Sequence, residues 1–180
     1  MKGHCLMHQE NKTAKRTLVV ETPSETRCLG KLLGEQLKGG EVILLAGSLG
    51  AGKTTMVQGI AAGLGIQEHV KSPSFVLERI YRGRLVLHHF DFYRLTQEDI
   101  LESGLLYDID DSAVVAIEWP ERAGEALPDS TLKVNIGFHE ECLDSRPVKS
   151  ENKCRITLET SEARWVEVIE TIWRHRNENG

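Results

Sequence analysis

The chain has 180 residues, 27% of them charged, and a formal net charge of −5. This length favours one domain that buries roughly 70% of its unfolded surface. The negative charge argues against sequence-independent nucleic-acid binding by this chain alone, because such binding needs a basic surface. No stretch approaches the roughly 20 apolar residues that cross a bilayer. The four cysteines form no CxxC pair, and reduced thiols in a cytoplasmic protein are the simplest interpretation.

The N-terminal part begins with a polar stretch. Residues 1–16 predict a flexible tail, and residues 17–180 are expected to form a single domain. A strand is predicted over Thr17–Glu21. A helix follows, because Thr22 can cap it, a proline comes next and Glu25 lies three residues after the cap. Apolar residues at helical spacing predict its buried face, formed by Cys28, Leu29, Leu32, Leu33 and Leu37.

The segment Gly47–Thr55, GSLGAGKTT, is typical of a phosphate-binding loop in both residue types and position. It follows Val42–Ala46, an apolar run that predicts a buried strand. It precedes MVQGIAAGLG, whose apolar residues recur at helical spacing. A P-loop requires this order, because it leaves a strand and delivers backbone N–H groups to phosphate at the start of a helix.

Each residue type in the loop has a chemical reason. Gly47, Gly50 and Gly52 allow positive φ and close approach of the backbone to phosphate. Lys53 is expected to bridge the β- and γ-phosphates of a nucleotide, and the Thr54 hydroxyl to bind Mg²⁺.

A loop with hydroxyl side chains follows the P-loop helix. Pro73 in VKSPSF disfavours helix at Ser72, so we expect an ordered loop leading into a strand over Phe75–Tyr81. A tight turn then predicts a hairpin with a second strand over Leu85–Phe90. In a P-loop protein such a loop can approach the γ-phosphate as a switch, although a passive turn is the simpler interpretation for Ser72 and Ser74.

Two carboxylates end apolar runs. Asp91 follows LVLHHF, and Glu118 ends AVVAIE. Both are expected at the carboxyl edge of the sheet with the P-loop, because ligands of open α/β sheets bind there. Either carboxylate can serve Mg²⁺, directly or through water, and the sequence leaves the choice open. His88 and His89 alternate faces of the strand, so one of them is expected to be buried or to lie behind the site.

The remaining elements are predicted from local signals. A capping box at Thr96 and Asp99 predicts a short helix. Strands are predicted over Leu132–Phe138 and Arg155–Glu159, joined by a long, mobile and polar hairpin loop. Ser161 is expected to cap a final amphipathic helix.

The chain resembles the bacterial TsaE family, the small ATPase of tRNA threonylcarbamoyladenosine biosynthesis. The resemblance lies in GSLGAGKTT, KSPSF, HFDFYRL and IEWPE, in this order, and covers roughly Val20–Leu158. It implies an α/β, P-loop NTPase-like three-layer fold with a mixed parallel and antiparallel sheet, Mg-ATP binding and weak hydrolysis. It also implies two partner proteins, TsaD and TsaB, which modify an adenosine beside the tRNA anticodon, so that tRNA is reached through the complex.

The resemblance further implies roles for individual residues. Thr54 and Glu118 serve magnesium, Asp91 acts beside them as a catalytic or water-organising carboxylate, and Lys53 completes the catalytic set. Glu25 matches a position near the nucleotide. The residues implied to hold phosphates are Gly47, Gly50, Ala51, Gly52, Lys53, Thr54 and Thr55.

The chain departs from the family pattern at two positions. Ser48 stands where family members usually have aspartate, and Ser74 stands where they have threonine. Serine keeps the hydroxyl that a switch contact needs. The family also has a basic residue near the nucleotide, which here is either Lys153 or Arg155.

Other classes of nucleotide-binding protein compete with this interpretation. A small-molecule kinase carries an arginine-rich lid, and no such basic cluster lies between the predicted strands. A GTPase needs an NKxD motif, which neither Asn11–Lys12 nor Asn152–Lys153 completes. A non-catalytic module that senses ATP is a further alternative, because a sequence does not reveal turnover.

Overall fold

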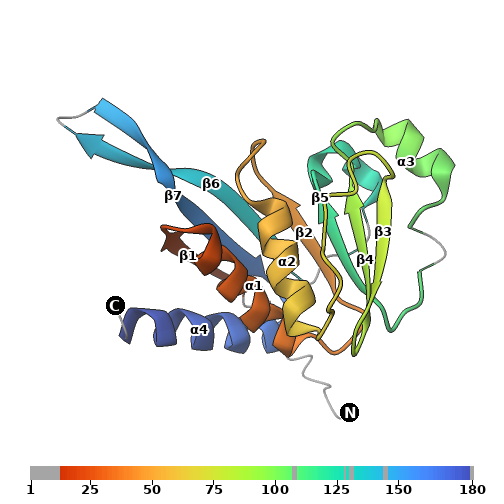
Figure 1. Cartoon of the computed structure of the whole chain (residues 1–180), viewed down its shortest axis with the longest axis horizontal. Helices are drawn as coiled ribbons and strands as arrows, with labels where there is room; N and C mark the ends of the chain where they lie inside the picture. The colour runs from red at the N-terminus through yellow and green to blue at the C-terminus, as the bar shows by residue number, and fades with distance from the viewer. Residues whose placement is uncertain (1–12, 107–108, 128, 130–131, 144–145, 179–180) are drawn as a thin grey trace, which may run out of the picture.

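The protein is built on a seven-stranded sheet with strand order β1-β7-β6-β2-β5-β4-β3 (Figure 1). The computed structural model describes residues 13–106, 109–127, 129, 132–143 and 146–178, with the backbone alone for 139–143, 146–152 and 175–178. The strands are β1 (Ala14–Val20), β2 (Val42–Ala46), β3 (Glu78–Arg82), β4 (Val86–Asp91), β5 (Val114–Glu118), β6 (Leu132–Leu143) and β7 (Arg146–Thr160).

The sheet is mixed, as the family resemblance implied. Four central strands, β4, β5, β2 and β6, run parallel. Antiparallel pairs complete both edges: β3 pairs with β4, β7 with β6, and β1 with β7. The helices are α1 (Pro23–Gln36), α2 (Lys53–Gly63), α3 (Gln97–Ser103) and α4 (Ala163–Glu178), with 3-10 turns η1 (Pro120–Arg122) and η2 (Gly124–Ala126).

Helices cover both faces of the sheet, which gives three layers. One face packs against α1, α2 and α4 in the larger core, which includes Leu33, Ile60 and Trp165. The other face packs against α3 and the 3-10 turns in a smaller core around Phe90 and Ile117. Among the described residues, no helix is both long and apolar enough to span a membrane.

Glycines bring α1 and α2 into backbone contact. A Cβ added at Gly34 would lie 2.3 Å from the carbonyl oxygen of Ile60, and one at Gly59 would lie 2.2 Å from that of Arg27. Both distances are far below van der Waals contact, so only glycine fits at these positions. This packing holds the P-loop helix directly against α1.

The close packing also corrects the predicted buried face of α1. Leu29, Leu33 and Leu37 are buried as expected, but Cys28 and Leu32 are exposed. The face of α1 that packs against α2 instead contains glycines, and a search for apolar residues at helical spacing does not detect them.

The limits of β1, β3 and β4 differ from the sequence prediction, and β4 covers Val86–Asp91 rather than Leu85–Phe90. β1 begins at Ala14, three residues earlier than predicted, because Ala14 to Arg16 pair with β7. Residues 1–12, most of the predicted tail, lie outside the described residues. β3 begins at Glu78 rather than Phe75, because the N–H groups of Val76 and Leu77 close a turn onto the Pro73 carbonyl.

The hairpin between β6 and β7 was predicted correctly, but the predicted length of its loop after Phe138 was wrong. β6 and β7 instead continue as a paired hairpin up to Leu143 and Arg146, with an irregularity between Phe138 and Glu140. Backbone pairing satisfies N–H and C=O groups whatever the side chains, so the polar composition of this segment did not indicate a loop. The final helix starts at Ala163, two residues after the predicted cap Ser161, and the Glu162 carbonyl accepts its first N–H bond.

Candidate active site

The loop between β2 and α2 has the backbone that its glycines predict. Gly47, Gly50 and Gly52 all have positive φ, at 147°, 79° and 106°. Gly47 also passes so close to β6 that an added Cβ would lie 2.1 Å from the Ile136 carbonyl oxygen. Gly52 precedes the first helical residue, Lys53, so the loop turns straight into the N-terminus of α2. Unpaired N–H groups at a helix start favour a bound anion.

The Lys53 side chain folds over this loop. Its Nζ donates to the carbonyl oxygens of Gly47, at 2.7 Å, and Ser48, at 2.9 Å. The same ammonium lies 3.8 Å from the centroid of the Trp119 ring. Burial lowers the pKa of Lys53, and the neighbouring Glu118 carboxylate most strongly opposes that shift.

Trp119 reaches Lys53 through an unusual backbone conformation. It has φ of 59°, a left-handed value that is rare for a bulky residue. Its ring also packs against Tyr93, with 4.8 Å between ring centroids. A strained aromatic residue directly after Glu118 therefore closes one side of the site.

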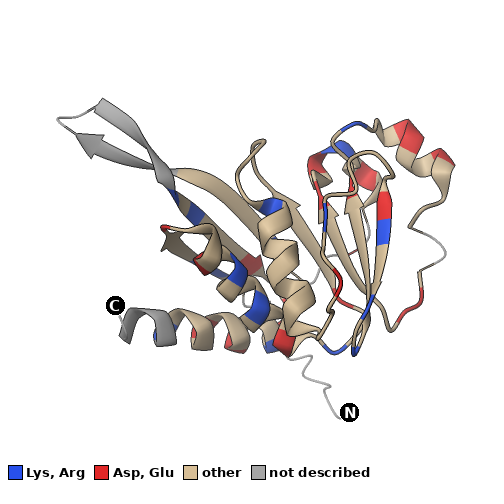
Figure 2. Ribbon diagram, viewed as in Figure 1, with Lys and Arg blue, Asp and Glu red and all other residues tan. Residues whose placement is uncertain are grey.

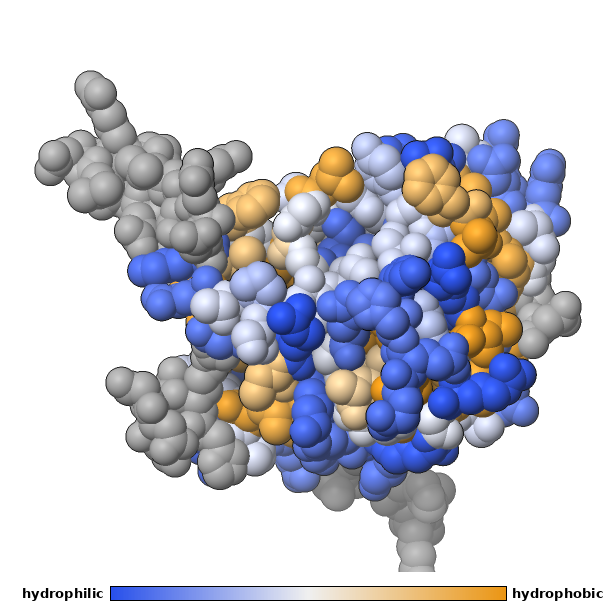
Figure 3. Space-filling model, in the orientation of Figure 1, coloured by the Kyte–Doolittle hydropathy of each residue, from blue (hydrophilic) through white to orange (hydrophobic). Residues whose placement is uncertain are grey.

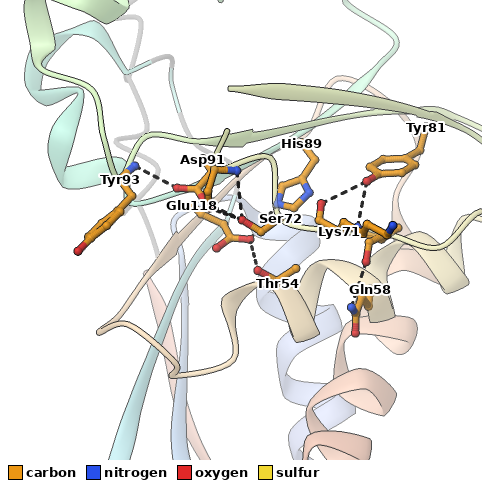
Figure 4. Close-up of polar contacts among 11 residues, drawn as sticks. Thr54, Gln58, Lys71, Ser72, Tyr81, His89, Asp91, Tyr93 and Glu118 are labelled. Atoms are coloured by element: carbon orange, nitrogen blue, oxygen red, sulfur yellow. Dashed lines mark hydrogen bonds and ion pairs between the residues drawn. The ribbon is translucent and has the colours of Figure 1, made fainter. Parts of the chain in front are cut away.

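Asp91 and Glu118 both lie at the carboxyl edge of the sheet, as predicted. Each is the last residue of its strand, and they are paired in the β4–β5 register. Both are 3% exposed. Glu118 Oε1 accepts the Thr54 hydroxyl at 2.8 Å, so the P-loop threonine contacts Glu118 (Figure 4).

Asp91 has a different set of partners. Its Oδ2 accepts hydroxyls from Ser72 at 2.8 Å and Ser74 at 2.5 Å. Its Oδ1 accepts the Tyr93 N–H at 3.0 Å. The loop after α2 therefore contacts Asp91 directly through the hydroxyls of both serines.

Two further side chains hold this loop in place, and the sequence analysis missed both. The Tyr81 hydroxyl bonds both backbone groups of Lys71, at 3.1 and 3.3 Å (Figure 4). Gln58 of α2 donates to the Val70 carbonyl at 3.1 Å. Neither position carries a sequence signal, because the contacts join segments that are separated by ten residues or more.

Two cavities adjoin the P-loop, and their linings contain the predicted site residues except Gly47 and Glu25. The first has a volume of about 300 Å³. Its lining includes Leu49, Gly50, Gly52, Lys53, Thr54, Thr55, Ser72, Ser74, Asp91, Tyr93, Glu118 and Trp119. The second, of about 190 Å³, shares Gly50, Gly52 and Thr55 with it and is closed by Ala51, Thr22, Phe138 and Cys154. Burial raises the pKa of the Cys154 thiol, which favours its protonated form.

Glu25 lies in the first turn of α1, where its N–H donates to the side chain of the capping residue Thr22. Its carboxylate accepts the Thr22 hydroxyl at 3.4 Å and the Glu21 N–H at 3.3 Å. The neighbouring Thr22, Pro23 and Thr26 line the second cavity, while Glu25 does not.

The two basic residues expected near the nucleotide, Lys153 and Arg155, do not line the first cavity. Lys153 Nζ lies 3.4 Å from Oε1 of Glu21, which lines the second cavity. The guanidinium of Arg94, a basic residue three positions after Asp91, lies 4.5 Å from the centroid of the Phe75 ring. Arg155 lies in β7, opposite Val19 and Gly137. Among the described residues that line the first cavity, Lys53 is the only basic one.

The oxygen atoms of this site fit Mg²⁺. Thr54 and Glu118 offer a hydroxyl and a carboxylate, which are hard ligands. The described part of the chain holds no group of three or more His, Cys, Asp or Glu side chains able to bind a metal. Mg²⁺ commonly takes one or two protein ligands and completes its shell with water and phosphate, so this sparse set suits it.

Comparisons with known proteins agree on one family. The family model for threonylcarbamoyl adenosine biosynthesis protein TsaE matches residues 20–147. The chain is 41% identical over 119 residues to the tRNA threonylcarbamoyladenosine biosynthesis protein TsaE of Treponema pallidum, covering 66% of this chain and 88% of that protein. It is 50% identical over 118 residues to the Nostoc protein of the same name, covering 63% and 72%. The crystal structure of Bacillus subtilis YdiB superposes with a TM-score of 0.69 at 30% identity, covering 92% of this chain and 98% of that one.

Proposed function

Because the chain belongs to the TsaE family of threonylcarbamoyladenosine biosynthesis proteins, we propose that it is the Mg-ATP-dependent ATPase component of that pathway. It works with TsaD and TsaB, through which it serves a tRNA adenosine beside the anticodon. Since tRNA processing is its task, the proposal includes a cytoplasmic location. The single observation that carries the proposal is the Thr54–Glu118 contact beside Lys53, within a cavity at the P-loop.

The two cavities support ATP as the ligand. A triphosphate on the loop would occupy the first cavity, where the N–H groups of the P-loop and Lys53 counter its charge. The base and sugar would extend into the second cavity, because it shares Gly50, Gly52 and Thr55 with the first. Thr22 and Phe138 supply polar and apolar contacts there.

Magnesium would be held by Thr54 and Glu118, and when bound it would neutralise charge on the phosphates. Asp91 would act on water. Its carboxylate lines the same cavity and already accepts hydroxyl groups, as it would from a water molecule. Lys53 holds phosphate once its ammonium leaves the loop carbonyls.

Turnover by the isolated chain is expected to be slow. Phosphoryl transfer commonly needs a second positive side chain, and one supplied by a partner is worth about 10³ to 10⁵ in rate. Lys53 is the only basic residue among the described lining of the first cavity. A partner that covers this cavity would therefore supply the second positive charge.

Exposed apolar side chains around the cavity support docking of TsaD–TsaB at this edge. Leu49 is 71% exposed on the P-loop, and Phe75 is 83% exposed on the serine loop. Figure 3 shows apolar groups along the upper edge of this face, where the β2–α2 loop lies in Figure 1. Large exposed apolar side chains beside a functional cavity are typical of a binding surface.

The charge distribution supports indirect contact with tRNA. Lys and Arg are dispersed among the elements in Figure 2 rather than gathered along one of them, and the net charge is −5. A tRNA-binding surface would need clustered positive charge.

The proposal is tested with radiolabelled ATP and the purified chain, with and without TsaD–TsaB. We expect Mg²⁺-dependent release of inorganic phosphate that rises on addition of TsaD–TsaB. Transfer of label to a small acceptor would indicate a kinase instead. ATP binding without turnover under both conditions would indicate a module that senses ATP.

A further inference from the structure

His89 is buried next to the Glu118 carboxylate of the site. Its side chain is fully buried, and its Nε2 lies 2.9 Å from Glu118 Oε1. That same oxygen accepts the Thr54 hydroxyl at 2.8 Å. Figure 4 shows His89 and Thr54 approaching Glu118 from different elements, β4 and α2. One carboxylate oxygen is therefore held between two donors.

The two ring nitrogens of His89 differ, because Nε2 has a hydrogen-bond partner and Nδ1 has none among the described residues. A carboxylate can only accept, so Nε2 must carry a proton. Nδ1 is buried and has no hydrogen-bond partner among the described residues. A buried polar atom without a partner is costly, so an apolar side chain would fill this space better if packing were the only requirement. The polarity of the ring is explained by its bond to Glu118.

We propose that His89 is a positioning residue that holds the Glu118 carboxylate against Thr54, so that both metal ligands are in place before a metal binds. The inference rests on the proposed function, since it assigns a metal to these two oxygens. A carboxylate bonded from behind cannot rotate away from the cavity, and loss of such support typically costs 10- to 100-fold in metal affinity.

The test uses variants that separate the hydrogen bond from the packing. His89→Gln keeps a side-chain N–H near the Nε2 position, whereas His89→Leu removes it. His88→Leu is the matched control, because His88 is the adjacent residue of the same strand and its Nδ1 contacts Glu78 Oε1 at 2.6 Å, apart from Glu118. Binding of Mn²⁺ to the protein with bound ADP is measured by electron paramagnetic resonance, and ADP binding is measured separately with the metal chelated.

We expect His89→Leu to weaken Mn²⁺ binding by about 10- to 100-fold, while metal-free ADP affinity stays within about twofold. His89→Gln should recover most of the Mn²⁺ affinity, and His88→Leu should match the wild type. Unchanged Mn²⁺ affinity in His89→Leu would overturn the inference. So would an equal loss of metal-free ADP binding that His89→Gln does not rescue, because that pattern indicates a packing role.

The tautomer of His89 gives a readout that does not depend on a variant folding. Nitrogen NMR of the wild-type protein should find the proton on Nε2, and a ring without a proton on Nε2 would contradict the inference. The wild type also separates the two proposals. If the wild type fails to bind ADP and Mn²⁺, both the proposed function and this inference are overturned. If the wild type binds both and His89→Leu binds Mn²⁺ with unchanged affinity, the inference alone is overturned.

Discussion

Asp91 and Glu118 lie opposite each other at the ends of β4 and β5, but their carboxylates contact separate parts of the site. Glu118 bonds Thr54 of the P-loop helix, whereas Asp91 bonds the serines of the following loop. The β4–β5 register makes Asp91 and Glu118 neighbours, but their carboxylates have different hydrogen-bond partners. The metal ligand is therefore expected to be Glu118, with Asp91 acting beside it.

Substitution of the two carboxylates is expected to separate these roles. Glu118→Gln should weaken Mg²⁺ binding in the presence of nucleotide, because it removes the negative charge and one of the two oxygens beside Thr54. Asp91→Asn should leave Mg²⁺ binding close to normal and lower turnover by about 10²-fold or more, since it removes a base. Metal titrations and rates on both variants provide the measurement. If Asp91→Asn loses the Mg²⁺ dependence and Glu118→Gln keeps it, the assignment is reversed.

Lys53→Ala should weaken ATP binding by roughly 10- to 100-fold, the loss expected for a charge-assisted hydrogen bond. The variant is expected to remain folded, because β2 and α2 keep their packing. Lys71→Ala is the matched control, since Lys71 is exposed and contacts Tyr81 through its backbone. Calorimetric titration with ATP compares the two. Equal affinity in both variants would exclude Lys53 from the nucleotide site.

The pH dependence of stability should also report on Lys53. Because burial lowers its pKa in the folded state, the unfolded chain binds more protons between that lowered pKa and 10.5. The free energy of unfolding of the wild type should therefore rise with pH through this window, relative to Lys53→Met, which cannot titrate. Denaturant unfolding of both proteins from pH 8 to pH 10.5 measures the difference. A difference that stays constant or falls with pH would contradict the lowered pKa.

Gly34→Ala should destabilise the protein by about 1–3 kcal/mol, the usual cost of overpacking. Its added Cβ would lie 2.3 Å from the carbonyl oxygen of Ile60, so α1 and the P-loop helix α2 would have to move apart. Gly137→Ala is the control, because an added Cβ there meets no atom within 4 Å. Urea unfolding compares the two variants, and an equal effect in both would mean that the α1–α2 contact tolerates a side chain.

Ser74→Ala should reduce the stimulation of ATP hydrolysis by TsaD–TsaB while leaving ATP affinity within about threefold. Its hydroxyl contacts Asp91 and lies on the loop that carries the exposed Phe75, so it links the cavity to the proposed docking edge. Ser103→Ala, at the end of α3, is a control whose hydroxyl bonds only the local Ile100 carbonyl and Leu105 N–H among the described contacts. Phosphate-release assays at saturating TsaD–TsaB measure the stimulation, which should stay normal in the control.

Local patterns in the sequence were sufficient for much of the fold. The strand Val42–Ala46 and the positive φ of the loop glycines follow from residues close together in the chain. The same is true of the Thr22 cap of α1 and the Thr96–Asp99 capping box of α3. Caps, turns and periodicity act within a few residues, so they can be recognised without knowing what packs where.

Contacts between distant segments were decided only by the tertiary structure. The sequence placed Asp91 and Glu118 at strand ends but left the metal ligand open, because the choice depends on the Thr54 hydroxyl, 64 residues from Glu118. It also left open which of His88 and His89 is buried.

Packing and pairing account for the remaining differences. The face of α1 that contacts α2 contains glycines while Leu32 is exposed, and continued pairing of β6 with β7 replaced most of a predicted loop. The sequence by itself determined which chemical groups this protein carries and at which ends of its strands and helices they lie. The tertiary structure decided which of those groups share hydrogen bonds, because a hydrogen bond forms only within about 3 Å and the sheet register and helix packing set those distances.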